Sequence, residues 1–313
     1  MPCMTTAWPR LQEDIRTRRM EVPEDRIDMV LDTDTWNEVD DQFALCYSLL
    51  SGEKLDVRAV YAAPFHNARS RDAEDGMEKS YAEIVRLLSL MGRAPEGLAY
   101  KGVTRFMRSP EDPVDCPAAR DLIGRAMERP DDRPLYVVAI GAITDVASAL
   151  LLEPRIAERI VVVWLGGHAL HWPDTREFNL MQDPHAARTV FDSGVPAILV
   201  PCMGVASHMI TTVHELRACL GGRNALCDAL ISLVASYAPE HFGWGKPLWD
   251  VAAVGTLLHH RWTRSSWEPS PLITQDLRWA REEGRPRIRV VQSLDRNAIF
   301  RDMFAKLAAM RDA

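Results

Sequence analysis

The chain has 313 residues, a net charge of −7 and a pI near 5.8. A mildly acidic chain is a poor match for the polyanionic backbone of nucleic acids, which favours a basic protein surface. No apolar run approaches the ~18 residues of a membrane-spanning helix, and the six cysteines lack zinc-type spacing. We therefore expect a cytoplasmic protein that acts on neither nucleic acid nor membrane.

Short apolar runs alternate with longer helical patterns along most of the sequence. Residues 1–26 form a charged N-terminal extension without a predicted element, and residues 27–313 are expected to form one domain. The predicted strands are Ile27–Asp32, Leu55–Ala62, Leu135–Ile140, Ile160–Leu165, Ala197–Pro201 and Ile288–Gln292. The predicted helices are Val39–Leu50, Met77–Met91, Asp121–Glu128, Thr144–Leu152, Pro184–Asp192, Ala225–Ser236, Asp250–Leu258 and Arg296–Ala309.

This alternation indicates an α/β fold with an open, mainly parallel, Rossmann-like sheet covered by helices on both faces. The predicted strands are almost continuously apolar, which is typical of strands that are buried on both faces. In such folds, functional residues gather at the carboxyl ends of the strands.

An acidic segment follows the first predicted strand. Four aspartates, Asp32, Asp34, Asp40 and Asp41, lie within ten residues, and a predicted helix begins among them. Helix capping accounts for one of these carboxylates but not for four. Carboxylates packed this closely repel one another, and Ca²⁺ or Mg²⁺ would neutralise them through oxygen ligands.

Two enzyme families place aspartates at this position. In haloacid-dehalogenase-like phosphotransferases, a strand ends in Asp-x-Asp-x-Thr, and Asp32 would be the nucleophile of a Mg²⁺-dependent phosphatase. In nucleoside hydrolases, Asp-x-Asp is followed closely by Asp-Asp at the start of a helix, as in Asp40-Asp41.

Later motifs favour the second family. Gly141-Ala142-Ile143-Thr144-Asp145 resembles the Gly-x-Leu-Thr-Asn turn of nucleoside hydrolases, and Leu165-Gly166-Gly167 resembles their Met-Gly-Gly. Glu177-Phe178-Asn179 and Asp183-Pro184-His185-Ala186-Ala187 match further family motifs, and Leu248-Trp249-Asp250 resembles the motif of the family's late aspartate, all in the right order. The resemblance to the inosine-uridine preferring nucleoside hydrolases covers roughly Ile27 to Leu258, whereas the phosphatase signature lacks its other parts.

The resemblance implies a site that cleaves the N-glycosidic bond of ribonucleosides. Ca²⁺ would be bound by Asp34, Asp41, Asp250 and the backbone carbonyl of Ile140, with Asp34 as the general base for the attacking water. Asp40, Glu177, Asn179 and Asp250 would hold the ribose. Relatives are often dimers or tetramers, so a homo-oligomer is expected.

The sequence departs from the family pattern in two places. Five residues, instead of three, separate Asp34 from Asp40, so Asn37 or Glu38 would be able to join the metal ligands. Trp249 replaces the histidine that protonates the leaving base in many relatives. An indole can stack on a base, which favours a purine substrate.

Three further residues are candidate substrate ligands. His171 lies six positions before Glu177, where relatives often have asparagine. His66 and Asn67 follow the second predicted strand and would lie at the same edge of the sheet. Because the family histidine is absent, a second interpretation also stays open, in which the protein binds nucleosides or ribose without catalysis.

Overall fold

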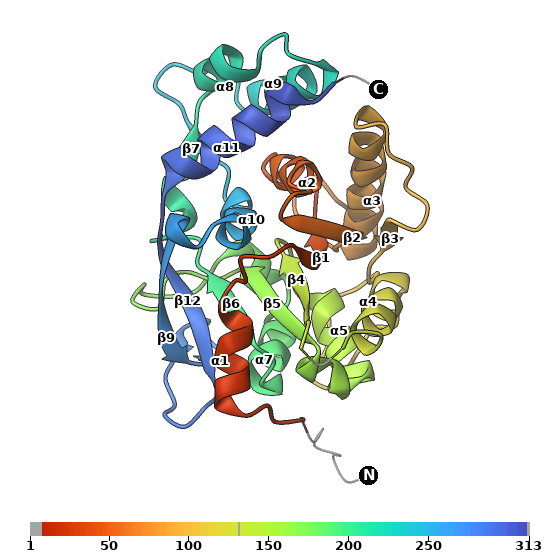
Figure 1. Cartoon of the computed structure of the whole chain (residues 1–313), viewed down its shortest axis with the longest axis vertical. Coiled ribbons are helices and arrows are strands. Elements are labelled where there is room, and N and C mark those ends of the chain that lie inside the picture. Colours follow the sequence, from red (N-terminus) through yellow and green to blue (C-terminus); the bar gives the residue numbers. More distant parts are fainter. Residues whose placement is uncertain (1–7, 131, 312–313) are drawn as a thin grey trace.

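The computed structural model describes residues 8–130 and 132–311, and an eight-stranded sheet forms its centre (Figure 1). The strand order is β3-β2-β1-β4-β5-β6-β12-β9, and every neighbouring pair is parallel except β12 and β9. The strands are β1 (Ile27–Thr33), β2 (Leu55–Ala62), β3 (Ala99–Lys101), β4 (Leu135–Ala139), β5 (Ile160–Leu165), β6 (Ala197–Val200), β9 (Thr263–Pro269) and β12 (Arg287–Leu294).

Strands β4 and β5 are apolar at every position because both faces of the sheet are covered. On β4, Val137 packs in one hydrophobic core and Val138 in the other, and on β5, Val162 and Val163 divide in the same way. Successive side chains of a strand point to opposite faces, so a continuous apolar run supplies both cores.

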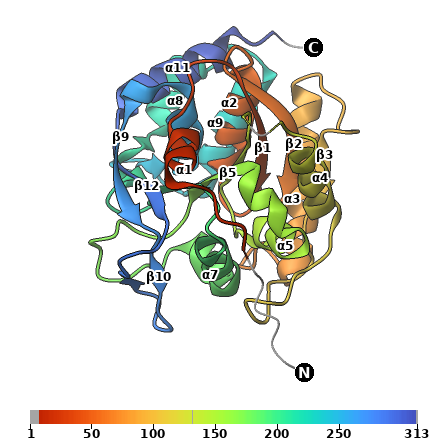
Figure 2. The same cartoon turned by 60° about the horizontal axis from the view of Figure 1, so that its bottom comes forward.

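The helices form two layers, and Figure 2 shows them on either side of the sheet. The first layer contains α2 (Asp41–Leu50), α3 (Ala73–Leu90), α8 (Val213–Leu220), α9 (Ala225–Tyr237), α10 (Val251–Leu258) and α11 (Arg296–Ala309). The second contains α4 (Pro117–Met127), α5 (Thr144–Leu152) and α7 (Pro184–Ser193). Shorter elements are α6 (Phe178–Gln182), β7 (Ile210–Thr211), β8 (Lys246–Pro247), β10 (Leu272–Ile273) and β11 (Trp279–Ala280). No helix in the described part of the chain is long and apolar enough to cross a membrane.

The order in which the chain adds strands to the sheet reverses at its centre. From β1 it moves outward to β2 and β3, and it then returns to β4 on the other side of β1. The loops that follow β1 and β4 therefore diverge and leave a crevice at the carboxyl ends of the strands.

The expected α/β architecture is confirmed, and most of the predicted elements are present. The extension, however, contains a helix that was not predicted, α1 (Glu13–Met20), which packs against β12. Acidic residues in its first turn and arginines in its last turn suit the helix dipole. Tyr136 Oη donates to the Arg19 carbonyl (2.9 Å), and Arg289 Nη1 donates to the Met20 carbonyl (2.9 Å), so this helix is tied to the sheet.

Candidate active site

A cavity of about 280 Å³ lies at the crevice. Its walls come from the loops after β1, β4, β5 and β6 and from the starts of α6 and α10. The lining residues are Asp34, Asn37, Glu38, Asp40, Ile140, Leu165, His168, Arg176, Glu177, Phe178, Asn179, Cys202, Met203, Trp249 and Asp250.

Three buried aspartates meet where two helices begin. Asp40 and Asp41 lie at the start of α2, and Asp250 lies at the start of α10. Each offers a carboxylate oxygen within 4.8 Å of the other two, and the backbone N–H of Asp250 donates to Asp40 Oδ2 (3.4 Å). The positive ends of the two helix dipoles favour negative charge at this point.

Asp34 lies beside this cluster and interacts with Asp41 and Asp40. Both of its oxygens are buried, and neither has a hydrogen-bond donor within the described residues. Burial and then the charges of Asp41 and Asp40 raise the pKa of Asp34 well above its usual value. Burial and then the charge of Asp40 raise the pKa of Asp41 to about 8.

A buried carboxylate without a donor is unfavourable, and repulsion from its neighbours adds to the cost. Burial and then the charges of Asp40, Asp41 and Asp34 likewise raise the pKa of Asp250. This set of convergent hard oxygen atoms suits a divalent cation, which would compensate the repulsion.

Short hydrogen bonds tie the end of β1 to the start of α2. Thr33 Oγ1 donates to Asp41 Oδ1 (2.6 Å), and Gln42 Nε2 donates to the Thr35 carbonyl (2.6 Å). Because Thr33 and Asp41 are both buried, the bond between them fixes the direction of the Asp41 carboxylate.

Arg69 holds the loop between Asp34 and Asp40. Its Nη1 donates to the carbonyls of Trp36 (3.1 Å), Asn37 (3.4 Å) and Glu38 (3.0 Å). Asn67 Nδ2 donates to Asn37 Oδ1 (2.6 Å). The loop that follows β2 therefore supports residues that line the cavity.

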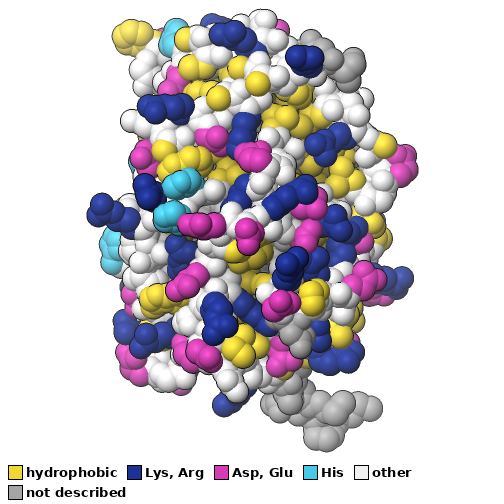
Figure 3. Space-filling model, in the orientation of Figure 1, with side chains coloured by type: hydrophobic (Ala, Val, Ile, Leu, Met, Phe, Trp, Pro, Cys, Tyr) yellow, Lys and Arg dark blue, Asp and Glu magenta, His cyan; other side chains and the backbone are white. Residues whose placement is uncertain are grey.

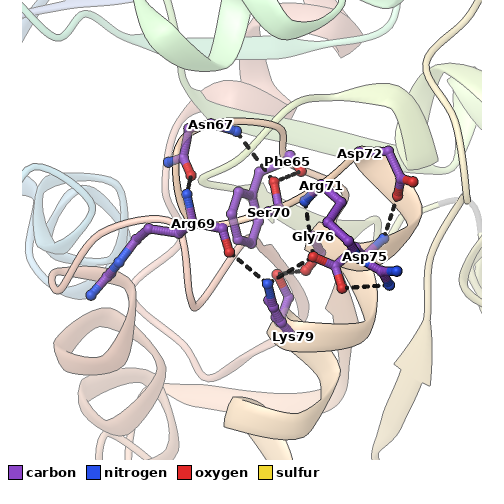
Figure 4. Close-up of polar contacts among 10 residues, drawn as sticks. Phe65, Asn67, Arg69, Ser70, Arg71, Asp72, Asp75, Gly76 and Lys79 are labelled. Atoms are coloured by element: carbon purple, nitrogen blue, oxygen red, sulfur yellow. Dashed lines mark hydrogen bonds and ion pairs between the residues drawn. The ribbon is translucent and has the colours of Figure 1, made fainter.

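Figure 4 shows how this supporting loop is itself held. Lys79 Nζ donates to the Arg69 carbonyl (2.6 Å) and to Asp75 Oδ2 (2.7 Å), and the backbone N–H of Arg69 donates to Asn67 Oδ1 (2.8 Å). A Cβ at Gly76 would lie 1.9 Å from the Phe65 carbonyl oxygen, so only glycine allows the loop to pack this closely on α3.

Lys246 supplies a positive charge beside the acidic cluster. It is buried and forms an ion pair with Glu38, whose Oε1 also accepts from Tyr237 Oη (3.1 Å). Burial lowers the pKa of Lys246, but the charges of Asp40 and Glu38 outweigh it and raise the pKa to about 12.

Glu177 and Asn179 are fixed by the backbone around them. The Glu177 carboxylate accepts from the N–H groups of Gly167 (2.8 Å), Asn179 (2.9 Å) and Leu180 (3.0 Å). Burial raises the pKa of Glu177 to about 7. Asn179 Nδ2 donates to the carbonyls of Ile140 (3.2 Å) and Leu165 (3.0 Å), which leaves a second lone pair on each oxygen.

Most of the residues expected from the sequence meet at this place. The cavity is lined by Asp34, Asp40, Ile140, Glu177, Asn179, Trp249 and Asp250, and Asp41 belongs to the adjoining acidic cluster.

Three expected substrate ligands do not line the cavity. His171 is exposed and lines a neighbouring cleft with Trp279 and Gln292, because the loop before α6 turns its side chain outward. His66 is also exposed, and its backbone N–H donates to Gln182 Oε1 (2.7 Å). Asn67 acts through Asn37 and lies behind the wall of the cavity.

Sequence reasoning missed several residues of the site. Cys202 and Met203 line the cavity directly after β6, so the rule that places function at strand ends would have found them. Lys246 lies in a short strand after an irregular stretch, and no local pattern indicates its role.

Two motif aspartates have structural roles. Asp183 accepts from the N–H groups of Ala186 (2.9 Å) and Met107 (2.8 Å) and from Thr144 Oγ1 (2.9 Å), which joins three segments. Asp32 is buried beside Asp145 and does not line the cavity, contrary to the requirement of the phosphatase interpretation.

Comparisons with known proteins agree with this geometry. Residues 29–301 match the family model of the inosine-uridine preferring nucleoside hydrolases. The chain is 26% identical over 246 residues to the pyrimidine-specific ribonucleoside hydrolase RihA of Escherichia coli O1:K1, which covers 70% of this chain and 76% of that protein. RihA of Salmonella arizonae is 27% identical over 257 residues, with 74% and 79% covered.

Solved structures show the same fold. A plant nucleoside hydrolase, PpNRh1, has a TM-score of 0.72 at 19% identity and covers 90% of this chain and 99% of its own. The purine-preferring ribonucleoside hydrolase of Gardnerella vaginalis also has a TM-score of 0.72, at 20% identity, with 90% and 98% covered. Because the family match spans most of the chain, this protein belongs to the inosine-uridine preferring nucleoside hydrolase family and is an enzyme that hydrolyses the N-glycosidic bond of ribonucleosides.

Proposed function

We propose that this enzyme is Ca²⁺-dependent and holds the ion with Asp34, Asp41, Asp250 and the carbonyl oxygen of Ile140. The observation that carries the proposal is the buried cluster of Asp40, Asp41 and Asp250 with Asp34 beside it, since both Asp34 oxygens lack donors within the described residues. When bound there, Ca²⁺ would supply a positioned and more acidic water.

Asp34 is the proposed general base. It lines the cavity, and its oxygens are not engaged by another donor, so the carboxylate can accept the proton of the attacking water. The hydrogen-bonded Thr33 and Asp41 beside it keep the end of β1 in place.

The ribose is proposed to lie against Asp40, Glu177, Asn179 and Asp250. Breaking the bond to the base leaves positive charge on the sugar ring, and buried carboxylates stabilise that charge most in a dry site. Glu177 is preorganised for this role because three backbone N–H groups fix its carboxylate before substrate enters.

Trp249 is proposed to stack on the base and to favour purines. It lines the cavity next to Asp250, and its indole has a large flat face but no acidic proton to give to the leaving nitrogen. The names of the relatives point both ways, since RihA is pyrimidine-specific and the Gardnerella enzyme is purine-preferring.

The test is a panel of inosine, adenosine, guanosine, uridine and cytidine offered to chelator-treated enzyme with and without Ca²⁺. We expect ribose release that depends on Ca²⁺, with kcat/KM higher for the purine nucleosides. Unchanged release in chelator would overturn the metal assignment, and a higher kcat/KM for the pyrimidine nucleosides would overturn the purine preference.

A further inference from the structure

A larger cavity lies at the opposite edge of the sheet. Its volume is about 990 Å³, and it is lined by Arg287 at the start of β12 and by Gly194 in the turn before β6. The candidate active site is at the carboxyl ends of the strands, whereas this cavity is at their amino ends. A ligand bound here would therefore not occupy the active site.

The N-terminal extension forms one wall of the cavity. Trp8, Arg10 and Arg16 all line it, and they lie outside the part of the chain that matches the family model, residues 29–301. The cavity is thus built partly from a segment that the hydrolase function does not use. Figure 3 shows this face of the molecule, where basic and acidic side chains are interspersed around α1.

The lining carries more positive than negative charge. Five arginines line the cavity beside three carboxylate residues, and the arginines are Arg10, Arg16, Arg281, Arg285 and Arg287. Arg285 pairs with Asp192 (2.6 Å) and Arg281 with Glu283 (2.6 Å). The exposed side chains of Arg10 and Arg287 have no ion-pair or hydrogen-bond partner within residues 8–130 and 132–311.

Arg16 gives an independent indication of an anion. Its side chain is only 2% exposed; Nη2 donates to the Gly194 carbonyl, and Nε lies 3.7 Å from Glu13. Its Nη1 is buried and has no hydrogen-bond partner among the described residues. A buried, unpaired guanidinium donor is unfavourable, and an anionic oxygen would satisfy it.

Two tryptophans line the same cavity from different segments. Trp8 comes from the extension, and Trp267 lies on β9 with 37% of its surface exposed. Indole faces stack on nucleobases, and guanidinium groups bind phosphate through paired N–H donors. A volume of this size accommodates a complete nucleotide.

We infer that this cavity is a second binding site, which takes a nucleoside monophosphate. The arginines hold the phosphate, and Trp8 and Trp267 contact the base. The ligand resembles the substrate of the enzyme but carries a phosphate group, which the acidic cluster of the active site would repel.

Calorimetric titration of the full chain in EDTA tests the inference. The probes are adenosine and uridine 5′-monophosphates, ribose 5-phosphate, inorganic phosphate and adenosine. We expect a nucleoside monophosphate to bind at least about tenfold more tightly than ribose 5-phosphate, and adenosine to bind this cavity far more weakly.

Variants of the protein test the contacts to the phosphate and to the base separately. Arg287→Glu and, independently, Arg10→Glu should weaken every phosphate ligand about tenfold or more. Trp267→Ala should remove the advantage of the nucleotide over ribose 5-phosphate. Arg264→Glu is the matched control, since Arg264 is exposed on the same strand as Trp267 but lies outside the cavity.

Several outcomes would overturn the inference. These are no binding of any phosphate probe, equal binding of inorganic phosphate and nucleotide, or binding that survives Arg287→Glu and Arg10→Glu in folded proteins. Loss of nucleotide binding in Asp250→Asn would place the ligand in the active site instead. None of these results depends on whether nucleosides are hydrolysed.

Discussion

Asp34 sits among other carboxylates in a position that is unfavourable for an unpaired charge. Its two oxygens have no donor in the described part of the chain, and burial with the charges of Asp41 and Asp40 raises its pKa. Replacing the Asp34 carboxylate by a neutral group should therefore raise the stability of the metal-free protein and lower its activity.

Asp34→Asn is expected to make the metal-free protein more stable while lowering kcat at least ~10²-fold, the usual scale for a lost general base. Asparagine removes a carboxyl group whose ionisation is opposed by burial and by Asp41 and Asp40, so melting in EDTA should shift upward. The upward shift on adding Ca²⁺ should shrink, since a ligand is lost. Melting curves with and without Ca²⁺, together with ribose release, measure all three effects.

Asp32→Asn is the matched control, because Asp32 is also buried on β1 but faces Asp145 and not the cavity. It should retain the Ca²⁺-dependent shift in melting temperature. If Asp34→Asn retained full activity, the role of Asp34 as base would be wrong.

Trp249→Ala should raise KM for inosine by about tenfold, since stacking on a base contributes about 1–3 kcal/mol. The effect on kcat should be smaller, because the tryptophan has no proton to transfer. Trp249→Phe retains a stacking face and should recover most of the loss. Steady-state kinetics of the two variants decide this, and a KM unchanged in Trp249→Ala would place the base elsewhere.

At the scale of elements, the loop between β1 and α2 depends on the loop after β2. The carbonyls of Trp36, Asn37 and Glu38 all accept from Arg69, so one guanidinium sets the path of the segment between Asp34 and Asp40. The segment between these aspartates is longer than in the family pattern, and it is held in place by a side chain from another loop.

Arg69→Ala is expected to weaken Ca²⁺ activation by about 10- to 100-fold, as is typical when groups that orient metal ligands are removed. A Ca²⁺ titration of activity gives the midpoint. Arg71→Ala is the control in the same loop, since that side chain is 83% exposed and, among residues 8–130 and 132–311, pairs only with Asp75. Equal midpoints for the two variants would show that Arg69 does not position the site.

The buried elements could be predicted closely from the sequence. The bounds of β2, β5, α5 and α11 agree with the predictions, because apolar periodicity is strongest where an element is covered by the core. By contrast, β9 was missed: it is an antiparallel edge strand with the mixed sequence Thr-Arg-Ser-Ser-Trp-Glu-Pro. In α1, charges at both ends support the helix, but few apolar positions mark it.

The residues of the candidate site likewise differ in how well the sequence predicts their positions. Residues at strand ends and helix starts, such as Asp34, Asp40 and Asp250, line one cavity because regular elements fix where they lie. His171 was assigned by counting back from Glu177, and counting does not determine the direction of a side chain on an irregular loop. Lys246 joins the site only through long-range packing, which a local pattern does not record.

At the scale of the whole molecule, the acidic cluster should make stability depend on pH and metal together. Burial and then the charge of Asp40 raise the pKa of Asp41 from 3.8 to about 8, so the folded metal-free protein retains protons that the unfolded chain releases. The stabilisation is complete below the unfolded pKa and is lost as the pH rises towards 8.

The melting temperature of the protein in EDTA is therefore expected to contain a component that falls between about pH 4 and pH 8. Because Ca²⁺ must displace these protons, the stabilisation that it adds should grow over the same range. Melting curves at several pH values, with EDTA or with Ca²⁺, measure both trends. A Ca²⁺ increment of the same size at about pH 5 and about pH 8 would contradict the linkage.

The contact between α1 and β12 joins segments that lie about 270 residues apart in sequence. During synthesis on the ribosome, residues 13–20 emerge long before residues 287–294, so the helix has no complete docking surface until almost all of the chain has been translated. The contact between them therefore forms late in folding, and a nascent chain stalled before β12 would leave β6 as an unpaired edge strand.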